Sequence, residues 1–224
     1  MKKLIAIILV LASSLALFSC GESKDTIKKV NKMYKAILPT KIVTETTQDM
    51  GSQVLTGEYV LTTGTVDGKA VSTLYYNYQK LRSIEDGSGS TEELPWEEIT
   101  LTKEYHEDKG LRIDGGKWQK DGNDFAPTID DIALDISAKD VEDVSEDAAT
   151  KTITFIVPKD NTADVFGEDM APAADVSVTI THDGAAVMSM TITYTVQSDN
   201  KDHPEIVTTI KTVYSYEPQE ITIN

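Results

Sequence analysis

The sequence predicts an α+β fold in which about nine antiparallel strands form one sheet and two helices lie on its apolar face. Three observations predict it. Long segments rich in Thr, Val, Tyr, Ile and Leu alternate between apolar and polar residues, Asp-Gly turns separate some of them, and one segment has apolar residues at helical spacing. Strands with one buried and one wet face are typical of antiparallel sheets.

The first 19 residues have the pattern of an export signal. Lys2 and Lys3 precede an apolar run that ends at Phe18, which is shorter than the roughly 20 apolar residues of a spanning helix. Leu17-Phe18-Ser19-Cys20 resembles the lipobox of bacterial lipoproteins, and this implies cleavage before Cys20, the only cysteine, and its lipidation. The alternative is an ordinary secretory signal that leaves an unpaired thiol in an exported protein.

The leader therefore divides the chain into three parts. Residues 1–19 are the predicted lipoprotein signal peptide, residues 20–24 are the lipidated N-terminus and a short tether, and residues 25–224 are a single β-rich domain. The lipid on Cys20 would hold the domain outside the cytoplasm, at the cell membrane or at the outer membrane of an envelope that has one. The sequence leaves the choice between these two membranes open.

The net negative charge of the chain argues against some classes of binding partner. The chain has 37 acidic and 21 basic residues and a formal net charge of −16, so the clustered positive charge that nucleic acid needs is missing. The same sign repels anionic headgroups, so membrane contact is expected through the lipid alone. The acidic residues are dispersed along the chain, which favours a role in solubility over the alternative of a cationic partner.

A single amphipathic helix is expected to start at Asp25 and to end before Pro39. Its lysines are ordinary for the wet face of a helix that packs on a sheet, and the alternative is that its apolar stripe lies on the membrane. The stripe comprises Ile27, Val30, Met33, Tyr34, Ile37 and Leu38.

After this helix the apolar period changes to two. The turns Asp67-Gly68 and His182-Asp183-Gly184 predict hairpins. A second helix is expected to begin at Thr128, where Thr128 and Asp131 resemble a capping box, and an acidic loop is expected at 139–147. The nine expected strands are 41–48, 53–63, 70–82, 97–106, 111–114, 151–157, 175–182, 186–197 and 205–216.

Two helices are too few to cover such a sheet. Nine strands at about 4.8 Å spacing are roughly 43 Å wide, whereas a helix with its side chains is about 10 Å wide. Either the sheet curls toward a barrel, or part of its apolar face lines a groove, or loops such as 158–174 fill the space.

The order of elements resembles a known family. A lipobox, one helix, a run of long antiparallel strands, a second short helix, and strands that end in Val213-Tyr214-Ser215-Tyr216 and Pro218 are similar to the LolA/LppX-type lipoprotein superfamily. The resemblance implies a strongly curved half-barrel closed by helices over an apolar cavity. It also implies binding or carriage of lipids or acyl chains.

Tyrosines and methionines alternate with aliphatic residues in several strands, and these are the candidate ligand-lining residues. Met188, Met190, Ile192, Tyr194 and Val196 are expected to share one face. The alternative for the whole set is an ordinary core, because methionine adapts to irregular cores and to irregular ligands alike. The candidates are Tyr59, Leu61, Leu74, Tyr76, Tyr78, Met188, Met190, Tyr194, Ile210 and Tyr214.

Catalytic and metal-binding patterns are missing from the sequence. His106, His182 and His203 are scattered without a second ligand at metal-type spacing, and no Gly-x-Ser-x-Gly motif is present. Acidic pairs such as Glu97-Glu98 are expected on a solvated face, with weak calcium binding as the alternative. Trp96 and Trp118 are expected to cap the apolar layer. We expect no enzyme activity, no cofactor and no metal.

The sequence thus predicts a membrane-anchored extracytoplasmic lipoprotein that is not an enzyme and that binds a lipid or another apolar ligand on its sheet. The alternative is a structural or interaction lipoprotein with a fully packed apolar face. Its exposed strand edges or loops would bind another protein of the cell envelope.

Overall fold

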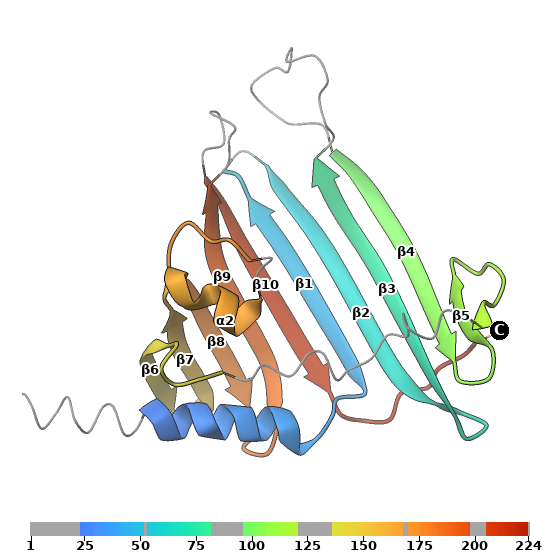
Figure 1. The fold of residues 1–224 in the computed structure, drawn as a ribbon, viewed down its shortest axis with the longest axis horizontal. Helices are drawn as coiled ribbons and strands as arrows, with labels where there is room; N and C mark the ends of the chain where they lie inside the picture. The colour runs from blue at the N-terminus through green and yellow to red at the C-terminus, as the bar shows by residue number, and fades with distance from the viewer. Residues whose placement is uncertain are drawn as a thin grey trace, which may run out of the picture.

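One ten-stranded antiparallel sheet dominates the computed structural model, which describes residues 23–51, 53–81, 96–120, 136–167, 170–197 and 205–223. The strand order is β5-β4-β3-β2-β1-β10-β9-β8-β7-β6, so the sheet is open, with β5 and β6 as its edges (Figure 1). The leader, Cys20 and the second helix expected at Thr128 lie outside the described residues.

The sheet consists of two five-stranded meanders joined at its centre, where β1 pairs with β10 from Lys41 opposite Ser215 to Asp49 opposite Val207. The first meander contains β1 (Lys41–Asp49), β2 (Val54–Val66), β3 (Lys69–Leu81), β4 (Trp96–His106) and β5 (Gly110–Ile113). The second contains β6 (Glu142–Asp147), β7 (Thr152–Val157), β8 (Val176–His182), β9 (Val187–Gln197) and β10 (Glu205–Ser215).

The expected count of nine strands is wrong, because β6 occupies the segment predicted as an acidic loop. Its sequence, Glu142 to Asp147, is acidic and has only one apolar residue, so it shows no alternation of the usual kind. The pairing of β6 with β7 also shifts between Glu142 and Ser145, and Asp143 has a φ of 51°. A bulge at a sheet edge removes the period-two signal on which strand prediction depends.

The two expected hairpins are present. Asp67 and Gly68 have φ values of 52° and 77° between β2 and β3, which is the conformation of a two-residue turn that requires positive φ at both positions. Between β8 and β9, the Asp183 carboxylate accepts hydrogen bonds from the backbone N–H groups of Ala185 and Ala186, at 2.7 and 2.8 Å.

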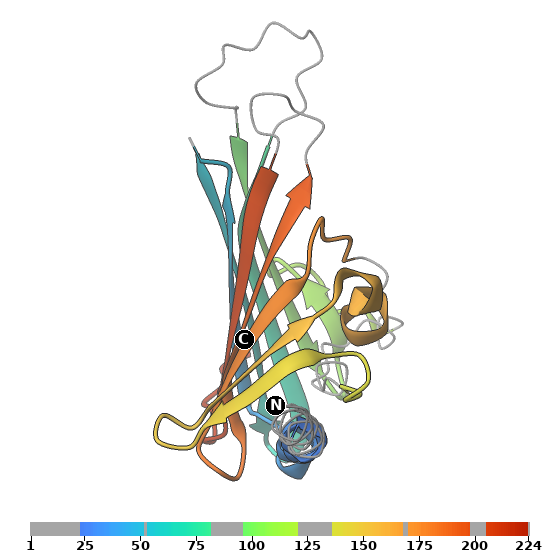
Figure 2. The same ribbon diagram turned by 90° about the vertical axis from the view of Figure 1, so that its left-hand side faces the viewer.

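Alternation gives the sheet an inner face, which carries the helices, and an outer face. Figure 2 shows both described helices on one side of the sheet, which twists so strongly that β6 and β7 cross the direction of β1 and β2. The inner side chains of β7, β8 and β9 are mainly Val, Ile, Phe and Met, whereas the outer ones are mainly threonine and serine. The apolar core therefore lies between the inner face and its helices.

The N-terminal helix (residues 23–36) covers one end of the inner face (Figure 1). It begins two residues before the expected start, so Ser23 and Lys24 belong to it and not to the tether. Its buried residues are Ile27, Val30, Met33 and Tyr34, whereas Ile37 and Leu38 follow its last turn and are exposed. Packing on the sheet, expected for this helix, is confirmed. Within the described part of the chain, no helix has the length and apolar character to cross a membrane.

Two tertiary contacts fix the helix on the sheet. The Tyr34 ring meets the Tyr214 ring of β10 edge to face at 5.8 Å, and the Asn31 side chain exchanges two hydrogen bonds with the backbone of Ile136, at 2.6 and 3.0 Å. Residue 136 belongs to the connection from β5 to β6. The helix therefore also holds the segment that links the two edges of the sheet.

A second described helix, α2 (Thr162–Phe166), lies within the segment 158–174 that was expected to be a loop. It follows a short 3₁₀ turn, Lys159–Asn161, and spans only five residues, too few for an apolar stripe to reveal a helix in the sequence. Val165, Phe166 and Met170 pack against the core from this segment. The sequence argument that such a loop could fill space on the inner face is confirmed for this part of the sheet.

Candidate functional site

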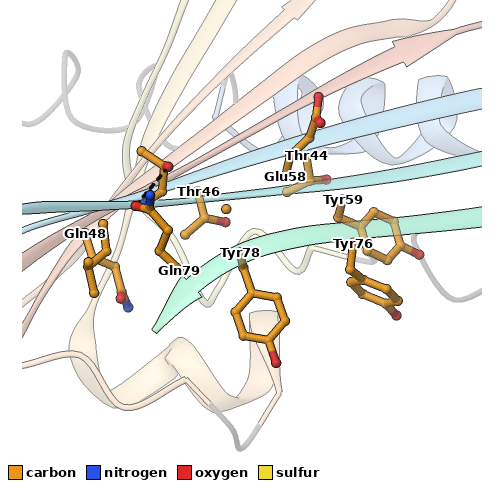
Figure 3. A pocket seen from close by; sticks show the side chains of 11 residues that line it. Thr44, Thr46, Gln48, Glu58, Tyr59, Tyr76, Tyr78 and Gln79 are labelled. Atoms are coloured by element: carbon orange, nitrogen blue, oxygen red, sulfur yellow. Dashed lines mark hydrogen bonds between the residues drawn. The ribbon is translucent and has the colours of Figure 1, made fainter. Parts of the chain in front are cut away.

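An open groove of about 290 Å³ lies on the inner face of β1, β2 and β3, and no residue of the two described helices is among those that line it (Figure 3). The β1 and β2 residues face each other in register, so that Thr44 lies opposite Tyr59 and Thr46 opposite Gly57. The lining residues are Thr44, Thr46, Gln48, Leu55, Thr56, Gly57, Glu58, Tyr59, Tyr76, Tyr78 and Gln79.

Three tyrosines form the aromatic end of the groove. Tyr59 of β2 lies directly opposite Tyr76 of β3, and their rings meet edge to face with centroids 5.1 Å apart. Tyr78 lies two residues farther along β3 and is 41% exposed. In Figure 3 the Tyr76 and Tyr78 rings point away from the strands on the same side. Partial burial raises the pKa of Tyr76, so its hydroxyl stays protonated at neutral pH.

Gly57 provides the space beside Tyr78. These two residues are register partners, and a Cβ atom at position 57 would be 3.1 Å from the Tyr78 Cβ. Such a contact is closer than van der Waals packing of two carbon atoms favours. Glycine at this position therefore allows β2 and β3 to approach while the inner face stays hollow.

The other end of the groove is polar, because the β2–β3 ladder ends there. Gly57 and Tyr78 are the last register pair, and the next backbone N–H, that of Thr56, donates to the side-chain oxygen of Gln79 at 3.0 Å. The Thr56 hydroxyl donates to the same oxygen at 3.3 Å, as Figure 3 shows. Thr46 and Gln48 continue this polar end on β1. The groove is therefore amphipathic along its length.

Charge is sparse in the groove. Glu58 is the only carboxylate among the lining residues, and its position in the β2 alternation places it on the outer face, opposite Glu45 of β1. Among the described residues, no group of three or more His, Cys, Asp or Glu side chains is arranged to hold a metal ion. The arrangement can thus hold an apolar or amphipathic molecule by contact and hydrogen bonding.

The predicted ligand-lining residues separate into three groups. Tyr59, Tyr76 and Tyr78 line the groove. Tyr194 and Ile210 are partly buried on the inner face beside the core, outside the groove lining. The remaining inner-face residues are less than 8% exposed and belong to the packed core: Leu61, Leu74, Met190 and Tyr214.

Met188 is the one predicted ligand-lining residue that lies neither in the groove nor elsewhere on the inner face. The β8–β9 register shifts between Thr181 and His182, so that Ser189 pairs with Thr181 but Val187 pairs with His182. Val187 is fully buried, whereas Met188 is 37% exposed. The expectation that Met188 shares a face with Met190 is therefore wrong, because the bulge interrupts the alternation that predicted it.

Sequence reasoning missed the polar half of the groove. Thr44, Thr46 and Gln48 alternate along β1, and Gly57 and Gln79 belong to neighbouring strands. For Thr44, Thr46 and Gln48 the signal was polar residues at inner positions of a strand. Gln79 follows the inner residue Tyr78, and it lines the groove only because the β2–β3 ladder ends there. Both features are legible only when the register across β1, β2 and β3 is known.

Neither described histidine belongs to a group of His, Cys, Asp or Glu side chains that could hold a metal ion. His182 lies in the covered region with a side chain only 4% exposed, and its Nε2 is 3.6 Å from the Glu146 carboxylate of β6, which also contacts Lys29 of the N-terminal helix. Burial and the Lys29 charge lower the pKa of His182, although Glu146 opposes them. His203 lies outside the described residues.

The two tryptophans differ. Trp118 covers the corner at β5, where the Arg112 guanidinium stacks 4.7 Å from its ring centroid and Arg112 pairs with Glu104 through two hydrogen bonds of 2.5 and 2.8 Å. Its ring partners, Arg112, Lys109 and His106, are cationic or polar, so the capping of the apolar layer by Trp118 stays a prediction. Trp96, by contrast, is 44% exposed at the start of β4.

Comparison with known proteins gives distant structural similarities. No family model and no curated protein matches the chain. Among solved structures, it is similar to a DUF1329 family protein from Desulfovibrio piger, at 9% identity over 85% of this chain and 92% of that chain, with a TM-score of 0.28. It is also similar to a domain named for outer membrane lipoprotein sorting from Vibrio parahaemolyticus, at 10% identity over 87% and 91% of the two chains, with a TM-score of 0.28.

A third similarity is to the MucA/MucB complex of Pseudomonas aeruginosa, at 11% identity over 84% of this chain and 93% of that chain, with a TM-score of 0.15. TM-scores this low carry no argument about function. The resemblance to the LolA/LppX-type superfamily therefore stays a prediction from the sequence.

Proposed function

We propose that this chain is a membrane-anchored extracytoplasmic lipoprotein, without enzyme activity, that binds a lipid or another apolar chain in the groove beside Tyr59, Tyr76 and Tyr78. One observation carries the proposal: on the inner face of β2 and β3, the core residues Leu61 and Leu74 lie next to tyrosines that border open space. A tyrosine ring can contact an apolar ligand while its hydroxyl stays in water, so tyrosines suit a surface that is covered only when a ligand is bound.

The chemistry of the groove favours an amphipathic ligand. An acyl chain would lie against the rings of Tyr76 and Tyr78, and a polar head would meet the amide and hydroxyl groups at Gln48, Thr46 and Gln79. The groove volume of about 290 Å³ is at the lower limit for small-molecule sites. It therefore suits one chain and not a complete multi-chain lipid.

The expected affinity is modest. A ligand that removes about 400 Å² of apolar surface from water gains roughly 10 kcal/mol, and association costs at least about 4 kcal/mol in lost freedom. The remaining 6 kcal/mol or so corresponds to a dissociation constant of tens of micromolar. With an affinity this low, the groove would exchange its ligand readily with the membrane to which the Cys20 lipid anchors the protein.

Photo-crosslinking of the complete chain tests the groove. The purified protein is reconstituted into phosphatidylcholine vesicles that contain a phospholipid with a diazirine group on one acyl chain, and labelled peptides are mapped by mass spectrometry. We expect label on the β2 and β3 peptides that contain Tyr59, Tyr76 and Tyr78. Label confined to the N-terminal helix, or spread evenly over both faces of the sheet, would contradict the proposal.

Tyr75 provides a matched control for this experiment. Tyr75 and Tyr76 are neighbours in β3 and both are half-buried, but Tyr75 faces outward. Tyr76→Asp places a carboxylate against the acyl chain and should lower labelling at least about fivefold. Tyr75→Asp should leave it unchanged, and equal losses in the two variants would indicate general unfolding.

The anchor has its own test. In a bacterial host fed with alkyne-modified palmitate, the chain should acquire the label and sediment with membranes. Cys20→Ala should lose both properties, because it removes the acceptor thiol. Membrane association of the unlabelled variant would contradict a lipid anchor at Cys20 and leave the groove proposal unaffected.

A further inference from the structure

The edge of the sheet at β4 is only partly covered. β5 pairs with the last four residues of β4, Lys103 to His106, and the Trp118 corner lies beside β5. Figure 1 shows that β4 extends well beyond β5. Residues Trp96–Leu101 of β4 pair with β3 along one edge of the strand. Along the other edge, no strand among the described residues pairs with them.

The direction of the backbone groups on this edge follows from Thr102. Its N–H donates to the Asp114 carboxylate at 2.7 Å, and its C=O accepts from the Asp114 N–H at 2.8 Å, so both groups point away from β3. Backbone groups alternate in direction along an antiparallel strand. Trp96, Glu98 and Thr100 therefore present their N–H and C=O groups to the open side, as a strip of three donors and three acceptors.

The opposite edge of the sheet differs. β6 has six residues, five of them polar or charged, and its register shift at Asp143 twists the edge. Short, charged and bulged edges are the features with which proteins prevent strand addition. The open part of β4 lacks the bulge: its register with β3 is continuous from Leu81 opposite Trp96 to Val71 opposite His106.

We propose that the Trp96–Leu101 edge of β4 binds an extended segment of a partner polypeptide as an eleventh strand. Main-chain hydrogen bonds to Glu98 and Thr100 would provide the affinity, and the side chains on the two faces would provide the specificity. This edge lies one strand away from the β3 tyrosines of the groove, and the proposal does not depend on the proposed lipid ligand.

The two faces of the edge define the partner. On the inner face, Ile99 and Leu101 are half-buried beside Tyr78 and Tyr76, so a partner residue next to them would be apolar. On the outer face, Glu98 and Thr100 are exposed, and the Glu98 carboxylate is the charge that a strand added at this edge would meet. A partner residue beside Glu98 on this face would be basic. The partner segment therefore alternates apolar and basic residues.

A second copy of this chain fits the edge less well. Pairing β4 with β4 of another copy would bring two Glu98 side chains and two chains of net charge −16 together. Like charges on adjacent strands are destabilising. Glu98 at the edge and the net negative charge of the chain favour a basic partner instead.

Hydrogen–deuterium exchange of the complete chain tests the proposal. The probe is a capped eight-residue peptide in which Val and Lys alternate, and the comparison is a block peptide of four Lys and four Val. We expect the alternating peptide to slow exchange in the peptic fragments that contain Glu98 and Thr100, and the block peptide to have little effect. Equal protection by both peptides would reduce the effect to charge attraction and overturn the proposal.

Thr100→Pro and Thr100→Ala form a matched pair. Proline removes the outward N–H at an edge position, where no ladder bond to β3 is lost, whereas alanine keeps the N–H. Affinity for the alternating peptide should fall at least about tenfold in Thr100→Pro and stay within about twofold in Thr100→Ala. Melting temperatures of the two variants identify any loss of fold.

Two outcomes would overturn the proposal. In the first, Thr100→Pro binds the alternating peptide as well as the unchanged chain does. In the second, the fragments around Glu98 are protected without peptide in a manner that rises with protein concentration, which would identify a second copy as the occupant.

Discussion

The two halves of the inner face use the same backbone for different purposes. In the covered half, Ile153, Phe155 and Val157 of β7 are all less than 2% exposed beneath the helices. In the open half, the corresponding surface of β2 and β3 carries Tyr59, Tyr76 and Tyr78, which border the groove. The aliphatic half forms the permanent core, and the tyrosine half provides a surface that tolerates water at its hydroxyl groups.

The difference lies in the side chains and not in the strands. Both halves are antiparallel and in register, and both alternate between the two faces. A tyrosine buries its ring and leaves its hydroxyl wet, so it costs less than phenylalanine where cover is incomplete. The composition of an inner face therefore indicates whether another element covers it.

The largest expected effect comes from the covered half. Phe155→Ala should lower the free energy of unfolding by about 3–5 kcal/mol, because the ring is 1% exposed and its removal leaves a cavity. Tyr78→Ala in the open half should cost less than about 1 kcal/mol, because that ring is 41% exposed. Urea unfolding followed by circular dichroism measures both, and equal losses would contradict the division into two halves.

Two methionines of β9 give a sharper version of the same comparison. Met190→Ala should cost about 2–5 kcal/mol, since Met190 is 7% exposed and the Tyr34 hydroxyl lies 3.3 Å from its sulfur. Met188→Ala should cost less than about 0.5 kcal/mol, because the bulge places Met188 at the surface. A large loss in Met188→Ala would show that this residue packs inward.

Much of the sheet was predictable because its strands are long and alternate cleanly. The strands β2, β3, β9 and β10 match the expected segments to within a few residues. Asp67-Gly68 correctly predicted the turn between β2 and β3. The exceptions are β6 and Met188. At both, a bulge moves side chains between faces, and a bulge depends on the partner strand, which a local pattern does not contain.

The groove was predictable only in part. Tyr59, Tyr76 and Tyr78 were found because aromatic residues at period two indicate an inner face. Alternation also selected Leu61, Leu74 and Tyr214, which belong to the packed core. Which inner positions a helix covers depends on where it docks, and that position is fixed by contacts such as Asn31 with Ile136 that are 105 residues apart.

A substitution at Asn31 therefore tests how the N-terminal helix is attached to the rest of the domain. Asn31→Ala removes both hydrogen bonds to the Ile136 backbone and leaves its N–H and C=O without these partners, so the unfolding free energy should fall by about 1–3 kcal/mol. Lys32→Ala, at an exposed neighbouring position of the helix, is the control and should change little. Hydrogen exchange should rise in the helix more than in β2 and β3.

The smallest expected effect concerns pH, and it also separates the two halves. Lys29 of the helix, Glu146 of β6 and Lys151 before β7 are the charged groups that act on His182, whose pKa in the folded state is lowered chiefly by burial. The unfolded chain then binds a proton more readily than the folded one, so stability is complete above about pH 6.5 and falls as the pH drops through the lowered folded pKa. The slope cannot exceed about 1.4 kcal/mol per pH unit for one group. Urea unfolding between pH 5 and pH 7.5 should show a smaller slope in His182→Gln than in the unchanged chain, and identical slopes would mean that His182 is not the group that weakens the covered half.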